Sequence, residues 1–457
     1  MIDALPFLML GSLVVLLFSG LPVAIILCGV GIAFCFVGIA LDEMPFIALY
    51  NIAPKLIYAI RGTPFYPAVV MLLFMGVALE KSGIAQDMLT SLRYLLRRLP
   101  AGLAIAVLLI GVVLAPAAGV VGASVVTLAL IALPAMLKHG YRPAEATGAI
   151  AAAGTVGIIL PPAVMLFFLS GKFQVPVGSM FMATVVPGGL LILLYLLYYL
   201  IRGWYAPPAQ TAAATDDYPE TTTGWLTLFV RGLIMPLALI ATVLGSIIMG
   251  LATPSQSGAI GAAGGLLLVF LNGRLTWPLF KDLVRTTANL SAMVFFIIIA
   301  AAVFSYPFRY FGGDTAIADL LTSLQMGPWA TLLLVVGLIF VLGFFIDWIE
   351  ITVITLPLFI PVLQALDFAA HAGDGKLAMI WMAGVTALVL QTSFLTPPFG
   401  FALFFLKGSA PPGVTLSHIY RGVIPILLIQ LTVIVTVLLV PEVITWLPIQ
   451  VYGQLSG

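Results

Sequence analysis

The sequence predicts an all-α protein that crosses a membrane many times. Of its 457 residues, 62% are hydrophobic and only 8% are charged, whereas soluble domains are about half apolar and about a quarter charged. Apolar stretches of about 20 residues, the length of one spanning helix, recur from Leu5 to the C-terminus. The alternating ten-residue segments typical of a membrane barrel do not occur. We therefore expect about eleven to fourteen helical spans or half-spans.

A polar segment divides the chain into two halves. Residues 204–225 contain YAPPAQTAAATDDYPETTTG, which is rich in Pro, Thr, Ala and acidic residues and predicts a linker. The first repeat is expected to cover residues 1–203 and the second residues 226–457. Each repeat should hold scaffold helices, a re-entrant hairpin and a broken helix. Transporter folds built from two inverted-topology repeats have this organisation.

Matching motifs in the two halves support the repeat. LPPAVMLFFLSG begins at Leu160 and TPPFGFALFFLKG begins at Thr396, so each half carries a double proline followed by LFFL. In the same order, GASVVTLALIALP (122–134) corresponds to DWIEITVITLP (347–357). The spacing between matched prolines widens towards the C-terminus. This widening predicts an insertion in the second half, at QALDFAAHAGDGK.

The double prolines predict one broken helix in each half. Proline has no N–H to donate to the carbonyl four residues back, so the pair at 161–162 frees the carbonyls of residues 157 and 158. The pair at 397–398 frees those of residues 393 and 394 in the same way. In hydrocarbon, such backbone is tolerated only inside protein or beside a cavity. Free carbonyls suit Na⁺, and the facing half-helix N-termini suit a carboxylate. The alternative is that each pair only kinks a span whose carbonyls bond to hydroxyls or water.

Glycine-rich segments predict the two hairpin tips. They are AAGVVGAS (117–124) and GFFIDWIE (343–350). Asp347 and Glu350 share a helical face, and ionisable residues at bilayer depth are functional candidates. The alternative is that Asp347 caps the second hairpin arm, while Glu350 pairs with Arg309 or lies at the membrane interface.

Composition and motifs argue against an enzyme or a nucleic-acid-binding protein. The net charge is +1, and the densest basic group, Arg93, Arg97 and Arg98, fits a cytoplasmic anchor. The three histidines are far apart, and neither a zinc-binding spacing nor a phosphate-binding loop occurs. We expect no catalytic residues, no cofactor, no metal ion other than Na⁺ and no nucleic-acid partner.

Together the motifs resemble the large membrane subunit of tripartite ATP-independent periplasmic (TRAP) transporters. The resemblance rests on GASVVTLALIALPAMLKHGY, GTVGIILPPA, GLATPSQSGAIGA and GFFIDWIEITVITLPLFIPV followed by TSFLTPPFGFALFFLKG, and it covers nearly the whole chain. The DWIE variant resembles the branch labelled mannitol/chloroaromatic. The family implies a multi-pass subunit of the bacterial inner membrane that imports a small organic acid with Na⁺ by an elevator-type motion. It also implies a small four-helix membrane subunit and a soluble periplasmic substrate-binding protein as partners.

The resemblance also assigns candidate binding residues. The first cation site falls on Gly119, Gly122, Ser124, Gly154 and Thr155, to which the proline break adds the carbonyl of Gly157. The second cation site falls on Gly343, Asp347, Thr392, Ser393 and Thr396. The substrate is expected at the two breaks, on Ser124, Pro161, Pro162, Thr396, Pro397 and Pro398. The family usually carries hydroxyls where this chain has Ala123 and Ala163, which leaves the full ligand set of the first site open.

Two further questions stay open at this point. A stand-alone ion-coupled organic-anion transporter would share the architecture and would need no binding protein. Arg309 is the nearest candidate for binding a carboxylate, but it equally fits an interfacial role. The linker is flanked by Arg202 and Arg231, which favours a cytoplasmic linker and, with inverted halves, a periplasmic N-terminus.

Overall fold

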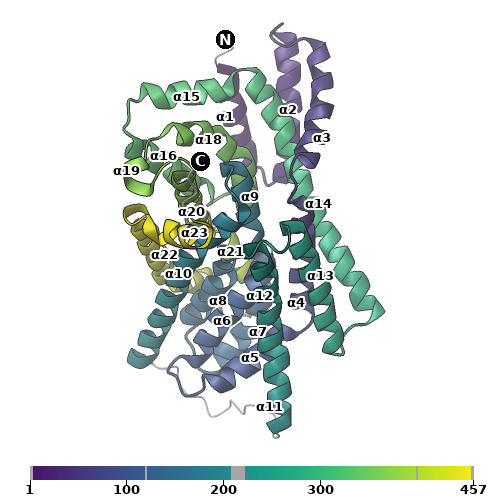
Figure 1. The fold of residues 1–457 in the computed structure, drawn as a ribbon, viewed down its shortest axis with the longest axis vertical. Coiled ribbons are helices and arrows are strands. Elements are labelled where there is room, and N and C mark those ends of the chain that lie inside the picture. The colour runs from purple at the N-terminus through teal and green to yellow at the C-terminus, as the bar shows by residue number, and fades with distance from the viewer. Residues whose placement is uncertain (1–3, 119–120, 207–221, 398–399, 454–457) are drawn as a thin grey trace.

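The computed structural model describes residues 4–118, 121–206, 222–397 and 400–453, and helices form all of their regular secondary structure (Figure 1). Eight helices in these ranges are long and apolar enough to cross a membrane, and a bent pair of helices forms a ninth candidate span. Five shorter apolar helices accompany them. The prediction of an all-α polytopic membrane protein is confirmed, and the number of spans and half-spans falls within the expected range.

The first half contains scaffold helices, a helical hairpin and a helix interrupted at the first double proline. A 3₁₀ turn at Phe46–Asn51 precedes α3. The α-helices are α1 (Leu5–Leu17), α2 (Val23–Ala40), α3 (Ile52–Arg61), α4 (Tyr66–Lys81), α5 (Ile84–Leu95), α6 (Gly102–Ala118), α7 (Val121–Lys138), α8 (Pro143–Val156), α9 (Val164–Phe173) and α10 (Val177–Tyr205).

The second half contains the remaining elements of the chain, including a second hairpin and a helix interrupted at the second double proline. Its helices are α11 (Thr222–Phe229), the π-helix η3 (Val230–Ile234), α12 (Met235–Ile248), α13 (Pro254–Leu271), α14 (Trp277–Tyr310), α15 (Gly313–Ser323), α16 (Pro328–Leu342), α17 (Trp348–Glu350), the π-helix η4 (Ile351–Thr355), α18 (Leu356–Ala365), α19 (Ala369–Ala372), α20 (Lys376–Ser393), α21 (Phe401–Ser409), α22 (Leu416–Leu439) and α23 (Glu442–Tyr452). Helices α10 and α11 extend into the two ends of the predicted linker. The predicted insertion spans the end of α18, α19 and the start of α20. The inverted relation of the two halves stays a prediction.

Two prolines explain the two π-helical turns. Turn η3 ends two residues before Pro236, and η4 ends two residues before Pro357. A proline inside a helix lacks the N–H for the carbonyl four residues back, and its ring clashes with that carbonyl. The preceding turn therefore widens, and such π-turns are frequent at functional sites. Turn η4 lies in the second arm of the hairpin that begins at α16, and η3 packs on α5.

The scaffold packs helices of the two halves against each other. Helix α2 packs along α14, and α4 packs along α13 on the same side of the molecule (Figure 1). Small residues allow these close approaches, since a Cβ added to Gly31 would lie 2.8 Å from the Val303 carbonyl oxygen. A Cβ on Gly258 would similarly lie 3.1 Å from the Ala68 oxygen. Helices α3 and α4 also contact α14, so the bent span belongs to this scaffold.

Helices α8 and α20, which lead to the two proline breaks, are deeply buried. All residues of α8 from Ala146 to Val156 are buried, and so is most of α20. Helix α8 packs on α22 at two glycines, because a Cβ on Gly148 would lie 2.3 Å from the Gly422 oxygen. The helices that end at the breaks are therefore enclosed by protein, as non-helical backbone at membrane depth requires.

Candidate functional site

The second hairpin touches the second broken helix at a glycine. Gly343 follows the first hairpin arm, α16, and Ser393 is the last residue of α20. A Cβ added to Gly343 would lie 2.1 Å from Ser393 Oγ and 2.2 Å from Ser393 Cβ. Only glycine fits at this position. The structure thus brings together two residues that are fifty positions apart in the sequence and were both assigned to the second cation site.

Asp347 begins the second arm of this hairpin. Its Oδ1 accepts a hydrogen bond of 2.7 Å from the backbone N–H of Trp348 and so caps the arm. Glu350 is buried, with 7% of its surface exposed. Arg309 instead pairs with Asp314, at 3.2 Å. The alternative that placed Glu350 against Arg309 or at the membrane interface is therefore wrong, because this turn faces the protein interior.

The first hairpin approaches the first broken helix in the corresponding way. Ser124 is buried near the start of α7, and its neighbour Val125 packs on Gly154 of α8. A Cβ on Gly154 would lie 2.4 Å from Val125 Cγ2 and 3.1 Å from Val125 Cα. Gly122 instead faces Phe405 of α21, whose ring would lie 2.7 Å from an added Cβ. Gly119 lies outside the described residues.

Each hairpin also contacts the far half of the other broken helix. Gly122 of the first hairpin meets Phe405 of α21, as described above. In the second hairpin, Trp348 packs edge-to-face on Phe168 of α9, with ring centroids 5.6 Å apart. The hairpins and the broken helices therefore form one interlocked group. The breaks themselves carry the prolines: Pro161 and Pro162 connect α8 to α9, and Pro397 follows α20. Pro398 lies outside the described residues.

The backbone at the breaks differs from the prediction. The Gly157 carbonyl accepts a hydrogen bond from the Leu160 N–H, at 3.2 Å. At the second break, the Ser393 carbonyl accepts from Thr396 N–H at 3.2 Å, and the Phe394 carbonyl accepts from Ala402 N–H at 3.3 Å. The prediction that all four carbonyls are free is wrong, because the chain tightens into turns whose amides replace those that proline lacks. Among described donors, none bonds to the Ile158 carbonyl.

The hydroxyls beside the breaks have their protons occupied. Each donates to a carbonyl three or four residues earlier in its own helix: Thr155 to Ala151 at 2.9 Å, Thr392 to Leu388 at 2.8 Å, Ser393 to Leu390 at 2.6 Å and Thr396 to Thr392 at 3.0 Å. A hydroxyl that donates its proton to the helix keeps its oxygen lone pairs for another partner. These four oxygens are therefore suited to a cation or to a ligand donor.

Several buried polar atoms near the second break were missed by the sequence analysis. Both amide atoms of Gln391 are buried and make no hydrogen bond within the described part of the chain. The same holds for Trp348 Nε1, Glu350 Oε2 and Thr352 Oγ1 in the second hairpin. Buried polar groups are normally satisfied, so this set indicates an interior that receives water, an ion or a polar ligand. A glutamine inside an apolar span, one position before Thr392, was the available signal.

Several arginines belong to elements at the end of the molecule where Figure 1 shows α5 and α11. Arg93 Nη2 lies 2.6 Å from His139 Nε2, which joins α5 to the end of α7. Arg202 at the end of α10 pairs with Glu145 of α8, at 2.8 Å. The elements at the opposite end, α15 and α19, carry or adjoin several acidic residues: Asp314, Asp319, Asp367 and Asp374. The two ends of the molecule thus differ in charge.

Known permeases are similar to this chain over most of its length. The isethionate TRAP transporter permease DctMQ of Oleidesulfovibrio alaskensis is 27% identical over 450 residues, which are 97% of this chain and 66% of that protein. The C4-dicarboxylate TRAP transporter large permease DctM of Pseudomonas aeruginosa is 27% identical over 86% of each chain. The sialic acid large permease SiaM of Vibrio cholerae is 23% identical over 95% of this chain and 96% of that protein. The chain thus spans just under two thirds of DctMQ.

Solved structures share the fold. The YdaH transporter of Alcanivorax borkumensis superposes with a TM-score of 0.61 at 17% identity, over 91% of this chain and 98% of that one. MtrF of Neisseria gonorrhoeae gives a TM-score of 0.56 at 14% identity, over 85% and 84%. These similarities concern the architecture alone.

The family follows from the match over nearly the whole length of the chain. The mannitol/chloroaromatic branch suggested by DWIE stays a prediction. The model of the DctM component of tripartite ATP-independent periplasmic transporters matches residues 10–443, and the chain therefore belongs to this family of TRAP transporter large permease subunits.

Proposed function

We propose that this permease imports a small organic acid together with Na⁺ across the bacterial inner membrane. In this proposal a soluble periplasmic protein delivers the substrate and a small membrane subunit completes the transporter. Family membership supports the two partners. The named relatives are transporters for C4-dicarboxylates, isethionate and sialic acid, which supports an organic acid as the substrate class.

The observation that carries the proposal is the contact between hairpin and broken helix in each half. Gly343 meets Ser393, and Val125 meets Gly154, with no room for a larger side chain at either glycine. Hydroxyl residues whose protons are already donated to backbone carbonyls belong to or adjoin both contacts in the sequence: Ser393 with Thr392 in one, and Thr155 next to Gly154 in the other. Sodium is a hard cation that binds carbonyl, hydroxyl and carboxylate oxygens, and broken helices at repeat interfaces are where coupled transporters bind such ions.

The two proposed cation sites would use different oxygens. At the second site, the Asp347 carboxylate and the hydroxyls of Thr392, Ser393 and Thr396 supply side-chain ligands. At the first site, Ala123 and Ala163 leave fewer hydroxyls. Ser124, Thr155 and backbone carbonyls, that of Ile158 in particular, would hold the ion there.

The packing supports an elevator-type motion. The interlocked hairpins and broken helices form one group, and the α2–α4 and α13–α14 helices form the scaffold. Aromatic side chains take part in the contact between them, with Phe65 at the bend of α3 and α4 lying against Phe167 and Phe168 of α9. Phenylalanine rings form no hydrogen bonds or ion pairs that would fix the group of hairpins and broken helices in one position against the scaffold. We place the basic end of the molecule in the cytoplasm, as the positive-inside rule requires.

The experiment measures uptake of labelled organic acids into proteoliposomes that contain the permease and its small subunit. Uptake should require both the binding protein and an inward Na⁺ gradient. Asp347→Asn tests the ion site, because asparagine still caps a helix but carries no charge. It should weaken Na⁺ activation about tenfold or more, as expected for loss of a charged ligand. Unchanged Na⁺ activation would reduce Asp347 to a helix cap, and Na⁺-driven uptake without the binding protein would identify a stand-alone transporter.

A further inference from the structure

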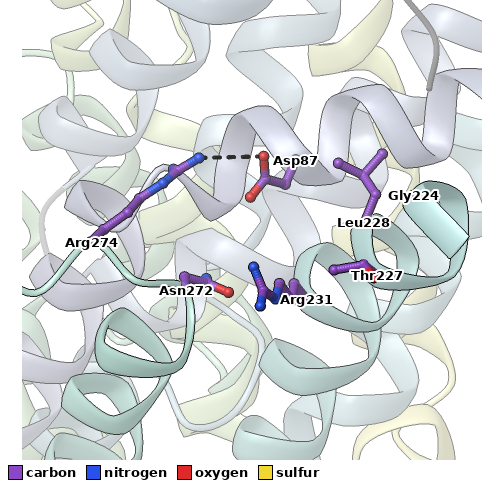
Figure 2. A pocket seen from close by; sticks show the side chains of 7 residues that line it. All are labelled: Asp87, Gly224, Thr227, Leu228, Arg231, Asn272 and Arg274. Atoms are coloured by element: carbon purple, nitrogen blue, oxygen red, sulfur yellow. Dashed lines mark ion pairs between the residues drawn. The ribbon is translucent and has the colours of Figure 1, made fainter.

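A polar pocket lies outside the candidate cation and substrate sites, and none of its lining residues belongs to those sites. It has a volume of about 490 Å³ and is bordered by α5, by α11 with η3, and by the turn between α13 and α14 (Figure 2). Figure 2 shows Asp87, Arg231, Asn272 and Arg274 around it, contributed by these three elements. The backbone of Gly232 in η3 packs directly on α5, since an added Cβ would lie 2.9 Å from the Asp87 carbonyl carbon. Two walls of the pocket, η3 and α5, are therefore closely packed against each other.

One arginine of the pocket is held by the protein. Arg274 Nη1 donates to the Ser82 carbonyl at 2.6 Å, and Nη2 lies 3.6 Å from Asp87 Oδ1. Gly83 makes room for this side chain, because any Cβ there would overlap the guanidinium, and its φ of +72° favours glycine in any case. Arg274 and Asp87 thus largely neutralise each other and form one wall.

Two other polar side chains of the pocket, those of Arg231 and Asn272, have no partner among the residues that the structure describes. Arg231 makes no hydrogen bond or ion pair there, and its guanidinium points into the pocket beside Asn272 (Figure 2). Both side-chain amide atoms of Asn272 are buried and unsatisfied. A buried amide without a partner is uncommon in proteins and indicates a missing ligand or water. The pocket therefore presents one uncompensated positive charge and an adjacent N–H donor.

The surface next to the pocket is apolar. Ile234 at the end of η3 is 47% exposed and lies one turn after Arg231, and Leu237 of α12 is 44% exposed. On α13, which packs along α12, Leu267 and Phe270 are 53% and 63% exposed and precede Asn272. Trp277, 74% exposed, begins α14 just beyond the pocket, as tryptophans do at the level of lipid headgroups. A charged pocket is thus continuous with a lipid-facing apolar surface.

We propose that this pocket binds the headgroup of an anionic phospholipid. The phosphodiester accepts hydrogen bonds from the Arg231 guanidinium and the Asn272 amide, and the acyl chains lie along the exposed faces of α12 and α13. The charges of Arg231, Arg274 and Asp87 add to +1, which a headgroup of charge −1, such as phosphatidylglycerol, balances. Basic pockets between spanning helices on the cytoplasmic side bind such lipids. The proposal does not depend on Na⁺ coupling or on the transported substrate.

The test measures lipid binding to the delipidated full chain by native mass spectrometry and by thermal stabilisation. Phosphatidylglycerol should bind and raise the melting temperature. Phosphatidylethanolamine, which has no net charge, should bind more weakly, and soluble glycerol 3-phosphate should give no stabilisation. Arg231→Gln should weaken phosphatidylglycerol binding about tenfold or more, because a charge-assisted hydrogen bond is lost.

Two further variants complete the test. Arg285→Gln is the matched control, since Arg285 is an exposed arginine of α14 outside the pocket, and its binding should stay within about twofold of the unmodified chain. Asn272→Asp leaves Arg231 in place but sets a negative charge against the phosphate, so it should also weaken binding, and it keeps the test valid if Arg231→Gln folds poorly. Equal phosphatidylglycerol binding in both pocket variants and the control would overturn the proposal. Equal binding of the two lipids, or stabilisation by glycerol 3-phosphate, would also overturn it.

Discussion

Replacing Gly343 by alanine tests whether the hairpin tip must sit against the broken helix. Gly343 has a φ of −66°, which alanine adopts freely. The effect of the substitution is therefore steric. The added Cβ would lie 2.1 Å from Ser393 Oγ and 2.2 Å from Ser393 Cβ, where ordinary contacts begin at 3.4 Å. A change of the Ser393 rotamer moves Oγ but not Cβ, so the two backbones must separate by more than about 1 Å.

The magnitude follows from the cost of overpacking. An extra carbon in a well-packed contact costs about 1–3 kcal/mol. Because about 1.4 kcal/mol corresponds to a factor of ten, the population with the tip seated on α20 should fall by about fivefold to about 150-fold. Displaced oxygens also bind a cation less well. We therefore expect Na⁺-driven uptake to fall at least fivefold while the amount of folded protein changes little.

The assay is the initial rate of uptake in proteoliposomes as a function of Na⁺ concentration. Gly337→Ala is the matched control, because it lies in the same hairpin arm and a Cβ there would meet nothing within 4 Å. It should transport normally and be stabilised slightly, since alanine favours the helix. Adding Ser393→Gly to Gly343→Ala removes both clashing atoms but also one proposed ligand, so it should restore part of the uptake rate at saturating Na⁺ and not the affinity for Na⁺. Normal uptake by Gly343→Ala would refute the close contact as a functional requirement.

Three further predictions concern other parts of the group. Gly154→Ala should reduce uptake by clashing with Val125 Cγ2, and Gly154→Ala combined with Val125→Ala should recover it in the same assay; no recovery would argue against this contact. Thr392→Ala should raise the Na⁺ concentration for half-maximal uptake several-fold and Thr392→Ser should not, because serine keeps the oxygen; equal behaviour of the two would exclude a ligand role. His139 Nδ1 donates to the Ala135 carbonyl, and its Nε2 accepts from Arg93. Burial first, and then the charges of Arg93 and Lys138, lower the pKa of His139, so the stability that neutral His139 contributes is complete above about pH 6.5 and is lost as the pH falls towards the lowered pKa. The melting temperature should therefore drop between pH 7.5 and pH 5.5 in the unmodified chain and less in His139→Gln.

The sequence predicted the features that depend on local composition. The spans follow from apolar length, and the ends of α8 and α20 follow from the double prolines. Proline chemistry also identified which amides are missing, but not how the chain continues after the break. The amides of Leu160, Thr396 and Ala402 bond to three of the four carbonyls, and their positions depend on turns that no local rule fixes.

The contacts between distant segments could not be predicted from the sequence. Gly343 and Ser393 lie in separate helices, and their approach depends on how α16 packs on α20. The sequence marked Gly343 only as part of a glycine-containing tip. Gln391 was overlooked for a related reason, because one amide in an apolar span becomes informative only when both of its polar atoms are known to be buried without a partner.

Alignment of the two halves on their double prolines indicates that the two proposed cation sites differ in their side chains. Thr392, Ser393 and Thr396 precede Pro397 by the same numbers of residues as Val156, Gly157 and Leu160 precede Pro161. Three hydroxyls of the second half thus correspond to residues that have no side-chain oxygen. The orphaned polar atoms of Trp348, Glu350, Thr352 and Gln391 also belong to the second half. A cation in the first half would have to depend mainly on backbone carbonyls, which mutation cannot remove. Side-chain substitutions should therefore impair coupling at the second site far more than at the first, whereas glycine substitutions that shift the backbone should impair both.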